Sequence, residues 1–169
     1  MFKVYTKRFG EIEIEEEKII RFPHGILGFP GIKRYIVLNH LNKPDIPFKW
    51  LQAVDNPDLA FVITDPVVFR PDYTPVINQQ DLKELGIINL SDRGIIAIVT
   101  IPQGNPENMT ANLQGPIVVN LRTREAKQIV LTGEEYQVRS PLLNNTSNAV
   151  LPRLNSKLSI TAAIPVMEK

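Results

Sequence analysis

The sequence predicts a mainly β fold, a single-domain antiparallel β-barrel or sandwich-like arrangement of short strands with one short helix. The first observation is a series of about nine or ten short apolar or alternating runs, separated by turn-forming residues every 8 to 12 positions, as in sandwiches and barrels. The second is that only one credible helix precedes residue 130, so alternating β and α units are not expected. The third is a length of 169 residues, which fits one domain.

Two apolar runs, residues 48–54 and 59–64, are expected to form the central hairpin. The four residues between them, 55–58, are Asp-Asn-Pro-Asp, a cluster of turn formers. Both runs are too apolar to alternate cleanly between a wet and a dry face, which indicates buried strands. Prolines flank residues 67–69, and proline donates no backbone hydrogen bond. We therefore expect a short edge strand or a bulged continuation there.

The segments before this hairpin predict a second hairpin, a loop and a strand. Residues 3–7 and 11–15 are expected to pair, and glutamate alternates with isoleucine in the second run, so that strand has an acidic face. Such a face is either simply solvated or attracts a basic protein partner. Residues 19–31 place three glycines and two prolines among apolar residues, which indicates a compact packed loop. Residues 33–39 are expected to form a strand.

The segments after the central hairpin predict the helix and the remaining strands. Asn78 is a suitable N-cap and Gly86 a suitable stop, and Leu82 and Leu85 share one face of the helix between them. The β-branched run at residues 94–101 predicts a second buried strand, which a surface loop follows. Further short strands are expected at residues 110–113, 117–121 and 128–131.

Composition and charge restrict the class of protein. There is no cysteine, which excludes disulfides, and no apolar run approaches the roughly 20 residues that span a bilayer. A cytoplasmic protein with no membrane partner is therefore expected. The first 138 residues carry 15 basic and 17 acidic side chains, a net charge of −2, and four basic residues and one acid follow. Because no basic stripe is present, we expect no direct binding of nucleic acid.

The C-terminal part differs from the rest, so the expected division is a β domain at residues 1–143 and a tail at residues 144–169. Residues 141–155 are rich in asparagine and contain two prolines, which is typical of a linker. Residues 158–167 are apolar again. This run either docks on the body, stays free, or joins neighbouring molecules, and docking is favoured because an exposed run of this kind promotes aggregation.

No constellation of residues indicates catalysis. The sequence has no nucleophile elbow, no HExxH and no phosphate-binding loop, so no enzymatic activity, cofactor, metal or small-molecule substrate is expected. His24 is expected to be structural, as a lone loop histidine usually is. The alternative is a small ligand-binding barrel or hydrolase that uses residues 25–31 as a lid and His24 as a base. It requires a pocket beside His24 and a carboxylate within hydrogen-bonding reach.

A continuous stretch from Thr6 to Leu142 is similar to a known family. Its most specific part is the run WLQAVDNPDLAFVITDP at residues 50–66, followed by Phe69 and then by Pro-Asp-Tyr at residues 71–73. Flanking segments agree in the same order: His-Gly-Ile at residues 24–26, Thr-Ala-Asn-Leu at 110–113 and Pro-Ile-Val-Val-Asn at 116–120. Together these segments resemble the flagellar assembly factor FliW family.

The resemblance implies a non-enzymatic, β-rich cytoplasmic adaptor. FliW-like proteins bind flagellin, and they also bind CsrA, a small RNA-binding regulator, which they hold away from flagellin messenger RNA. When flagellin is exported, FliW is free to capture CsrA, and translation of flagellin resumes. Flagellin and CsrA are therefore the partners that the resemblance implies. A mildly acidic body suits a basic RNA-binding partner, because complementary potential raises the encounter rate.

Two groups of residues are the candidates for partner contact. The first lies between prolines at a strand margin, where an aromatic side chain is either presented to a partner or folded back onto the core. The second belongs to the loop after a buried strand, which either binds a partner or only connects strands. Replacement of the tyrosine by alanine, and of the isoleucine by glutamate, is expected to weaken partner binding and leave the fold intact. The first group is Phe69, Asp72 and Tyr73, and the second is Ile101, Pro102 and Asn105.

Overall fold

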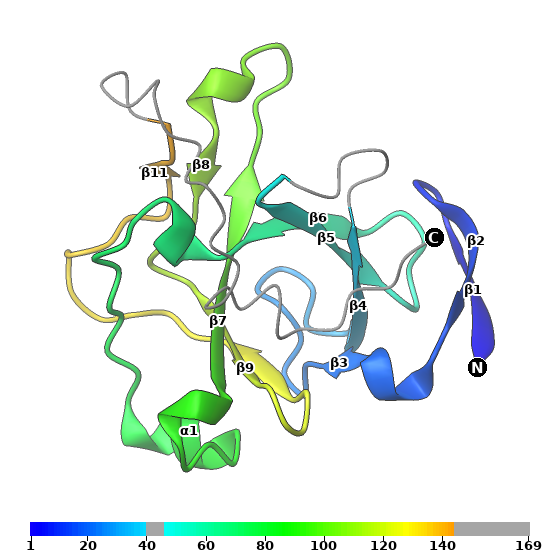
Figure 1. Ribbon diagram of the computed structural model, residues 1–169, viewed down its shortest axis with the longest axis horizontal. Coiled ribbons are helices and arrows are strands. Elements are labelled where there is room, and N and C mark those ends of the chain that lie inside the picture. The colour runs from blue at the N-terminus through cyan, green and yellow to red at the C-terminus, as the bar shows by residue number, and fades with distance from the viewer. Residues whose placement is uncertain (40–45, 144–169) are drawn as a thin grey trace.

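The computed structural model describes residues 1–39 and 46–143, which form a strongly curled antiparallel β structure (Figure 1). Nine strands belong to one sheet, and the other two, β1 and β2, pair separately. The predicted mainly β fold with one short α-helix is confirmed. The strands are β1 (Phe2–Thr6), β2 (Gly10–Ile14), β3 (Ile20–Arg21), β4 (Arg34–Asn39), β5 (Phe48–Ala53), β6 (Ala60–Thr64), β7 (Arg93–Thr100), β8 (Thr110–Ala111), β9 (Ile117–Asn120), β10 (Ala126–Gln128) and β11 (Ser140–Pro141).

The central hairpin is confirmed as β5 and β6. Trp50 lies opposite Val62, and Leu51 lies opposite Phe61. Successive residues of a strand point to opposite faces, so Leu51 enters the core inside the curl while Trp50 points outward. The hairpin lies near the middle of the sheet, whose order is β10-β9-β7-β6-β5-β4-β3, with β8 on β7 and β11 on β8.

The sheet curls until its two edge strands meet at one point. The backbone amide of Arg21 next to β4 donates to the carbonyl of Arg124 just before β10, at 2.9 Å. Only an isolated bridge forms there, between Arg21 and Glu125, so the curl is not closed by a full ladder. Its interior is filled by completely or almost completely buried side chains, the largest of which include Tyr35, Phe22, Leu51 and Ile63. The interior is therefore a packed core.

The outer face of the sheet is covered by three separate groups. The β1–β2 hairpin packs over β4 and the start of the chain's central hairpin, and the amide of Lys7 donates to the carbonyl of Pro57 at 3.0 Å. Residues around β8 and the segment that contains Tyr73 form a second cover. The helix α1 (Gln79–Glu84) and residues 129–131 form the third. Figure 1 shows β8 and the β1–β2 hairpin on opposite sides of β5 and β6.

The helix α1 begins and ends where its capping residues predict. The side-chain oxygen of Asn78 accepts a hydrogen bond from the amide of Asp81 at 2.8 Å. Gly86 ends the helix with a φ of +66°, a conformation that glycine adopts without strain. The leucines at 82 and 85 are buried, as predicted. One-turn 3₁₀ helices occur at Glu16–Lys18, Pro66–Val68, Leu90–Asp92 and Pro106–Asn108.

The prediction of an edge strand or bulge at residues 67–69 is wrong. The chain instead makes a 3₁₀ turn at Pro66–Val68. Proline fits the first position of such a turn because it has no amide hydrogen to satisfy, and the Asp65 carboxylate accepts from the amide of Val67 at 3.2 Å. These two local signals outweigh the β-branched character of Val67 and Val68.

Three boundaries also differ from prediction. The expected packed loop at residues 19–31 contains the two-residue strand β3, and the strand expected at 110–113 is limited to β8. The strand expected at residues 128–131 begins and ends earlier, as β10. Beyond it, the amides of Ile129 and Leu131 still donate to the carbonyls of Pro116 and Gln114, without continuing the ladder. The predicted tail at residues 144–169 lies outside the described residues.

Tyr35 in the core predicts a loss of stability at alkaline pH. Burial raises the pKa of Tyr35 to about 12, above its unfolded value of about 10. The neutral phenol therefore stabilises the fold fully below pH 10, and that contribution is lost as the pH rises from about 10 towards 12. Urea unfolding at a series of pH values measures the slope, which is expected to be smaller in Tyr35→Phe. An identical slope in both proteins would contradict the assignment.

Candidate functional site

The first predicted group, Phe69, Asp72 and Tyr73, is divided between surface and core. Phe69 is half-buried and its ring stacks on that of Phe48, with centroids 5.6 Å apart. Asp72 is exposed, and its carboxylate lies 3.5 Å from the guanidinium of Arg70. Tyr73 is only 4% exposed. Its side chain does not reach the surface, so of these three only Phe69 and Asp72 present atoms to a partner.

The position of Tyr73 corrects one expectation. Its hydroxyl donates to the carbonyl of Leu113 at 2.6 Å, and its ring packs edge-on against Tyr136 at 4.7 Å between centroids. Burial raises its pKa above the ordinary tyrosine range. Replacement by alanine removes core contacts, so the expectation that Tyr73→Ala leaves the fold intact does not agree with the structure. A role of Tyr73 in partner binding would be indirect, through the segment that carries Phe69 and Asp72.

The second predicted group forms an exposed turn after β7. Ile101 is 42% exposed, which is unusual for a large aliphatic side chain directly after a buried strand. Asn105 is exposed and Pro102 is half-buried. The amide of Asn105 donates to the carbonyl of Pro102 at 3.2 Å, which closes the turn. Ile101 is therefore the apolar member of this group that a partner can reach.

An apolar hollow connects the two groups. Its volume is about 240 Å³, and it is lined by Ile46, Phe48, Lys49, Trp50, Val62 and Ile101. We call it the aromatic hollow. Phe48 belongs to its wall and also stacks on Phe69, so this ring joins the predicted groups. On the side of the β1–β2 hairpin, Arg8 lies over the Trp50 ring at 4.0 Å from its centroid.

The sequence interpretation missed Phe48, Trp50 and Val62 as surface residues. All three were assigned to buried strands, yet the structure leaves them half-buried. Their alternation along the strands was the available signal: Phe48 and Trp50 are two residues apart, and Val62 lies opposite Trp50. Pairing the predicted hairpin in this register would have placed them together on one face.

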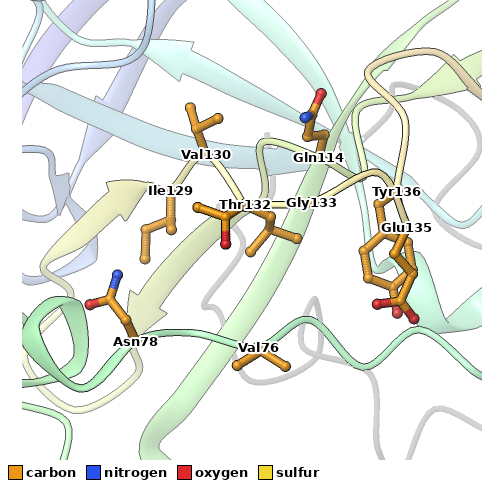
Figure 2. A pocket seen from close by; sticks show the side chains of 10 residues that line it. Val76, Asn78, Gln114, Ile129, Val130, Thr132, Gly133, Glu135 and Tyr136 are labelled. Atoms are coloured by element: carbon orange, nitrogen blue, oxygen red, sulfur yellow. The ribbon is translucent and has the colours of Figure 1, made fainter.

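A second hollow lies between the segment before α1 and the chain after β10 (Figure 2). Its volume is about 180 Å³, and its wall mixes aliphatic side chains with amides and a single carboxylate, that of Glu135. Figure 2 shows Val76 and Asn78 on one side of it and residues 129–133 on the other. No histidine lines it. The sequence did not predict this hollow, because its two walls are separated by about 50 residues of chain.

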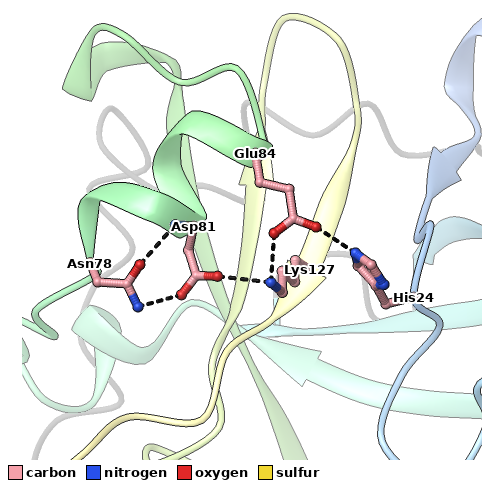
Figure 3. Close-up of polar contacts among 5 residues, drawn as sticks. All are labelled: His24, Asn78, Asp81, Glu84 and Lys127. Carbon is pink, nitrogen blue, oxygen red and sulfur yellow. Dashed lines mark hydrogen bonds and ion pairs between the residues drawn. The ribbon is translucent and has the colours of Figure 1, made fainter.

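His24 belongs to a chain of polar contacts on the surface (Figure 3). Its Nε2 contacts the carboxylate of Glu84, whose other oxygen accepts from the Lys127 ammonium at 2.8 Å. Lys127 also donates to Asp81 at 2.8 Å, and the Asn78 amide donates to Asp81 at 2.7 Å. These contacts tie the loop around His24, the helix α1 and the strand β10 together.

The electrostatics of this cluster favour a structural role. Hydrogen bonds from Lys127 and then from His24 hold the pKa of Glu84 below its usual value, and hydrogen bonds to Asp81 and Glu84 raise the pKa of Lys127. The alternative reading needed a carboxylate beside His24, and Glu84 supplies one. It also needed a pocket, but the His24 side chain is 61% exposed and lines neither of the two hollows described above.

The described residues gather no other chemistry. Among residues 1–39 and 46–143, no three His, Asp or Glu side chains are arranged to hold a metal ion. Within the same ranges, no helix is long and apolar enough to cross a membrane. The fold and its surfaces define a curled antiparallel β domain whose notable surface feature is an apolar hollow at the end of its central strands.

Comparison with known proteins identifies the family. The model of the FliW protein family matches residues 3–142, and the chain belongs to that family. Its curated relatives include the flagellar assembly factor FliW of Thermoanaerobacter pseudethanolicus, 41% identical over 87% of this chain and 97% of the relative. The flagellar assembly factor FliW of Alkaliphilus metalliredigens is 45% identical over 82% of this chain and 84% of the relative.

A solved structure agrees with this assignment. The crystal structure of a flagellar assembly factor FliW superimposes with a TM-score of 0.77 at 36% sequence identity. The match covers 85% of this chain and 98% of the other. The resemblance stated from the sequence is therefore confirmed at the level of the family and the fold.

Proposed function

We propose that this chain is a non-enzymatic cytoplasmic flagellar assembly factor that binds flagellin and the RNA-binding translational regulator CsrA. It would relieve CsrA repression of flagellin messenger RNA translation when flagellin is exported. Membership of the FliW family supports the general role. The observation that carries the binding role is the aromatic hollow, where the two groups of residues predicted to contact a partner meet.

The chemistry of the aromatic hollow suits a protein partner. Protein interfaces derive most of their binding energy from a few buried aromatic and aliphatic anchors, which a polar rim surrounds. Here Phe48, Trp50 and Val62 form an apolar floor, with Ile101 at the edge. Lys49 and the exposed turn that contains Asn105 supply polar groups around it. An apolar side chain of a partner would remove this floor from water.

Charge supports a basic second partner. The first 138 residues have a net charge of −2, and the exposed face of β2 carries Glu11 and Glu13. Lys3 partly neutralises that face through an ion pair with Glu11 at 2.7 Å. Complementary charge contributes mainly to the rate of encounter and to the choice of partner, and salt screens it. Binding of CsrA is therefore expected to weaken as the salt concentration rises.

Ile101→Glu is expected to lower the affinity for the partner that occupies the aromatic hollow by about tenfold or more, because it places a charge at an apolar interface. Ile88→Glu is the matched control, since Ile88 is 89% exposed and lies outside the lining of the hollow. Isothermal titration calorimetry of both variants measures the effect. Equal affinities of the two variants for flagellin and for CsrA would remove Ile101 from the interface.

Titration of the whole chain with flagellin and, separately, with CsrA of the same organism tests the proposed function. Each titration is made at two salt concentrations, followed by a competition in which one partner is added to the complex of the other. Binding to both partners with mutual displacement supports the switch. Binding to flagellin alone would leave an assembly factor with no regulatory role, and binding to neither would overturn the proposal.

A further inference from the structure

The aromatic hollow is a gap between two covers of the outer sheet face. The β1–β2 hairpin covers Trp50 from one side through Phe9, with ring centroids 6.3 Å apart. The residues around β8 cover Val99 on the other side. Between these covers Val62 remains half-buried, and it lies beside both Trp50 and Val99 in the sheet. The hollow is thus apolar sheet surface that the described covers leave partly exposed.

The described chain ends beside this hollow. Pro141 of β11, Thr110 of β8 and Thr100 of β7 lie in one cross-strand row. Both pairings are antiparallel, so β11 runs in the same direction as β7. The chain therefore continues beyond Pro141 towards the same end of the sheet as the chain that leaves Thr100 for Ile101. The amide of Leu142 donates to the carbonyl of Met109 at 3.2 Å, which anchors this exit.

The sequence that follows has the pattern of a one-sided strand. Residues 158–167, Leu-Ser-Ile-Thr-Ala-Ala-Ile-Pro-Val-Met, contain no charge. Every even position from 158 to 166 is apolar, whereas serine, threonine and proline occupy odd positions. In extended chain, alternate residues share a face, so this segment has one continuous aliphatic face. A free segment of this kind would be prone to self-association.

The connection is long enough to reach. Three strand spacings separate β11 from β6, a distance of about 14 Å. Residues 144–157 form a connection rich in asparagine, and a flexible chain of that length has a root-mean-square span of roughly 20 Å. A short flexible connection gives a tethered segment an effective concentration of the order of millimolar. A weak apolar contact is therefore sufficient for the segment to occupy the hollow.

We propose that residues 158–167 of the same chain occupy the aromatic hollow with their even-numbered face towards Trp50 and Val62. Because the hollow is also the surface assigned above to a protein partner, the segment competes with that partner. The occupancy stands on the fold alone, whereas the competition rests on the proposed function. The tail is then an internal competitor that a partner must displace, which lowers the apparent affinity of the free protein for that partner.

The single tryptophan makes the occupancy measurable in the full-length chain. Trp50 lines the hollow and is the one tryptophan of the sequence, so fluorescence quenching by acrylamide reports on this site. Ile160→Asp with Ile164→Asp is expected to raise the quenching constant and shift the emission to the red. Ser159→Asp with Ala163→Asp is the matched control, because it adds the same charge to the opposite face. The control is expected to quench as the unmodified chain does.

Other outcomes would overturn the proposal. Unchanged quenching in the Ile160 and Ile164 variant would show that the segment does not cover Trp50, and equal changes in both variants would exclude the one-sided contact. Protection that disappears on dilution would assign the hollow to the segment of a second molecule. For the competition, the Ile160 and Ile164 variant is expected to bind flagellin or CsrA more tightly. Changed quenching without partner binding would leave the occupancy standing and remove the competition.

Discussion

Tyr73→Ala is expected to lower the free energy of unfolding by about 3–5 kcal/mol, the range found for large aromatic side chains removed from a core. The ring of Tyr73 packs within the cluster that joins β7, β8 and the chain end, in edge-on contact with Tyr136. Its hydroxyl donates to the carbonyl of Leu113 at 2.6 Å. Alanine removes the ring, leaves a cavity and deprives a buried carbonyl of its donor.

Two further variants separate the ring from the hydroxyl. Tyr73→Phe keeps the ring and loses the hydrogen bond to Leu113, so a loss of about 1–2 kcal/mol is expected. Tyr35→Phe is the matched control: Tyr35 is also completely buried, but its hydroxyl has no hydrogen-bond partner among the described residues. Removing an unsatisfied buried hydroxyl is expected to leave stability unchanged or to raise it by about 1 kcal/mol.

Urea unfolding at neutral pH measures these differences, with the slope of the transition compared between variants to confirm that the change lies in stability. Equal losses for Tyr73→Phe and Tyr35→Phe would contradict the role assigned to the hydrogen bond to Leu113. A loss below about 1 kcal/mol for Tyr73→Ala would show that the site relaxes around the missing ring. In that case Tyr73 would again be a candidate for direct partner contact.

The parts of the fold that the sequence predicted well depend on neighbouring residues. The β5–β6 hairpin follows from two apolar runs around a four-residue turn, and α1 follows from Asn78 and Gly86 at its ends. Pro66 and Asp65 also carry a local signal, that of a 3₁₀ turn, but the β-branched residues between the prolines were given more weight. That error was one of interpretation, because the information was present in the sequence.

The candidate site was predictable only in part, because its contacts join distant segments. Ile101 was found from its loop, but the aromatic hollow also needs the register of β5 on β6 and the pairing of β6 with β7. The burial of Tyr73 depends on a carbonyl 40 residues away, and the contact of His24 with Glu84 spans 60 residues. Periodicity and turn signals carry no information at those separations.

Gly25→Ala is expected to destabilise the fold by about 2–5 kcal/mol, because it combines two costs. Gly25 has a φ of +69°, a left-handed conformation that costs a residue with a Cβ atom about 1–2 kcal/mol. A Cβ there would also lie 2.5 Å from the carbonyl oxygen of Phe29 and 2.7 Å from the Cα of Pro30. These are backbone atoms of the same loop, so relief requires the loop to move, at about 1–3 kcal/mol.

Gly28→Ala supplies the comparison that isolates the second cost. Gly28 has a similarly positive φ of +88°, but a Cβ there meets nothing within 4 Å, so only the backbone cost of about 1–2 kcal/mol is expected. Urea unfolding of both variants gives the difference. A larger loss at Gly25 means that residues 25–30 are packed too closely to open, and a lid over His24 is then ruled out. Equal losses would mean that the loop yields readily, and the hydrolase alternative would regain its moving part.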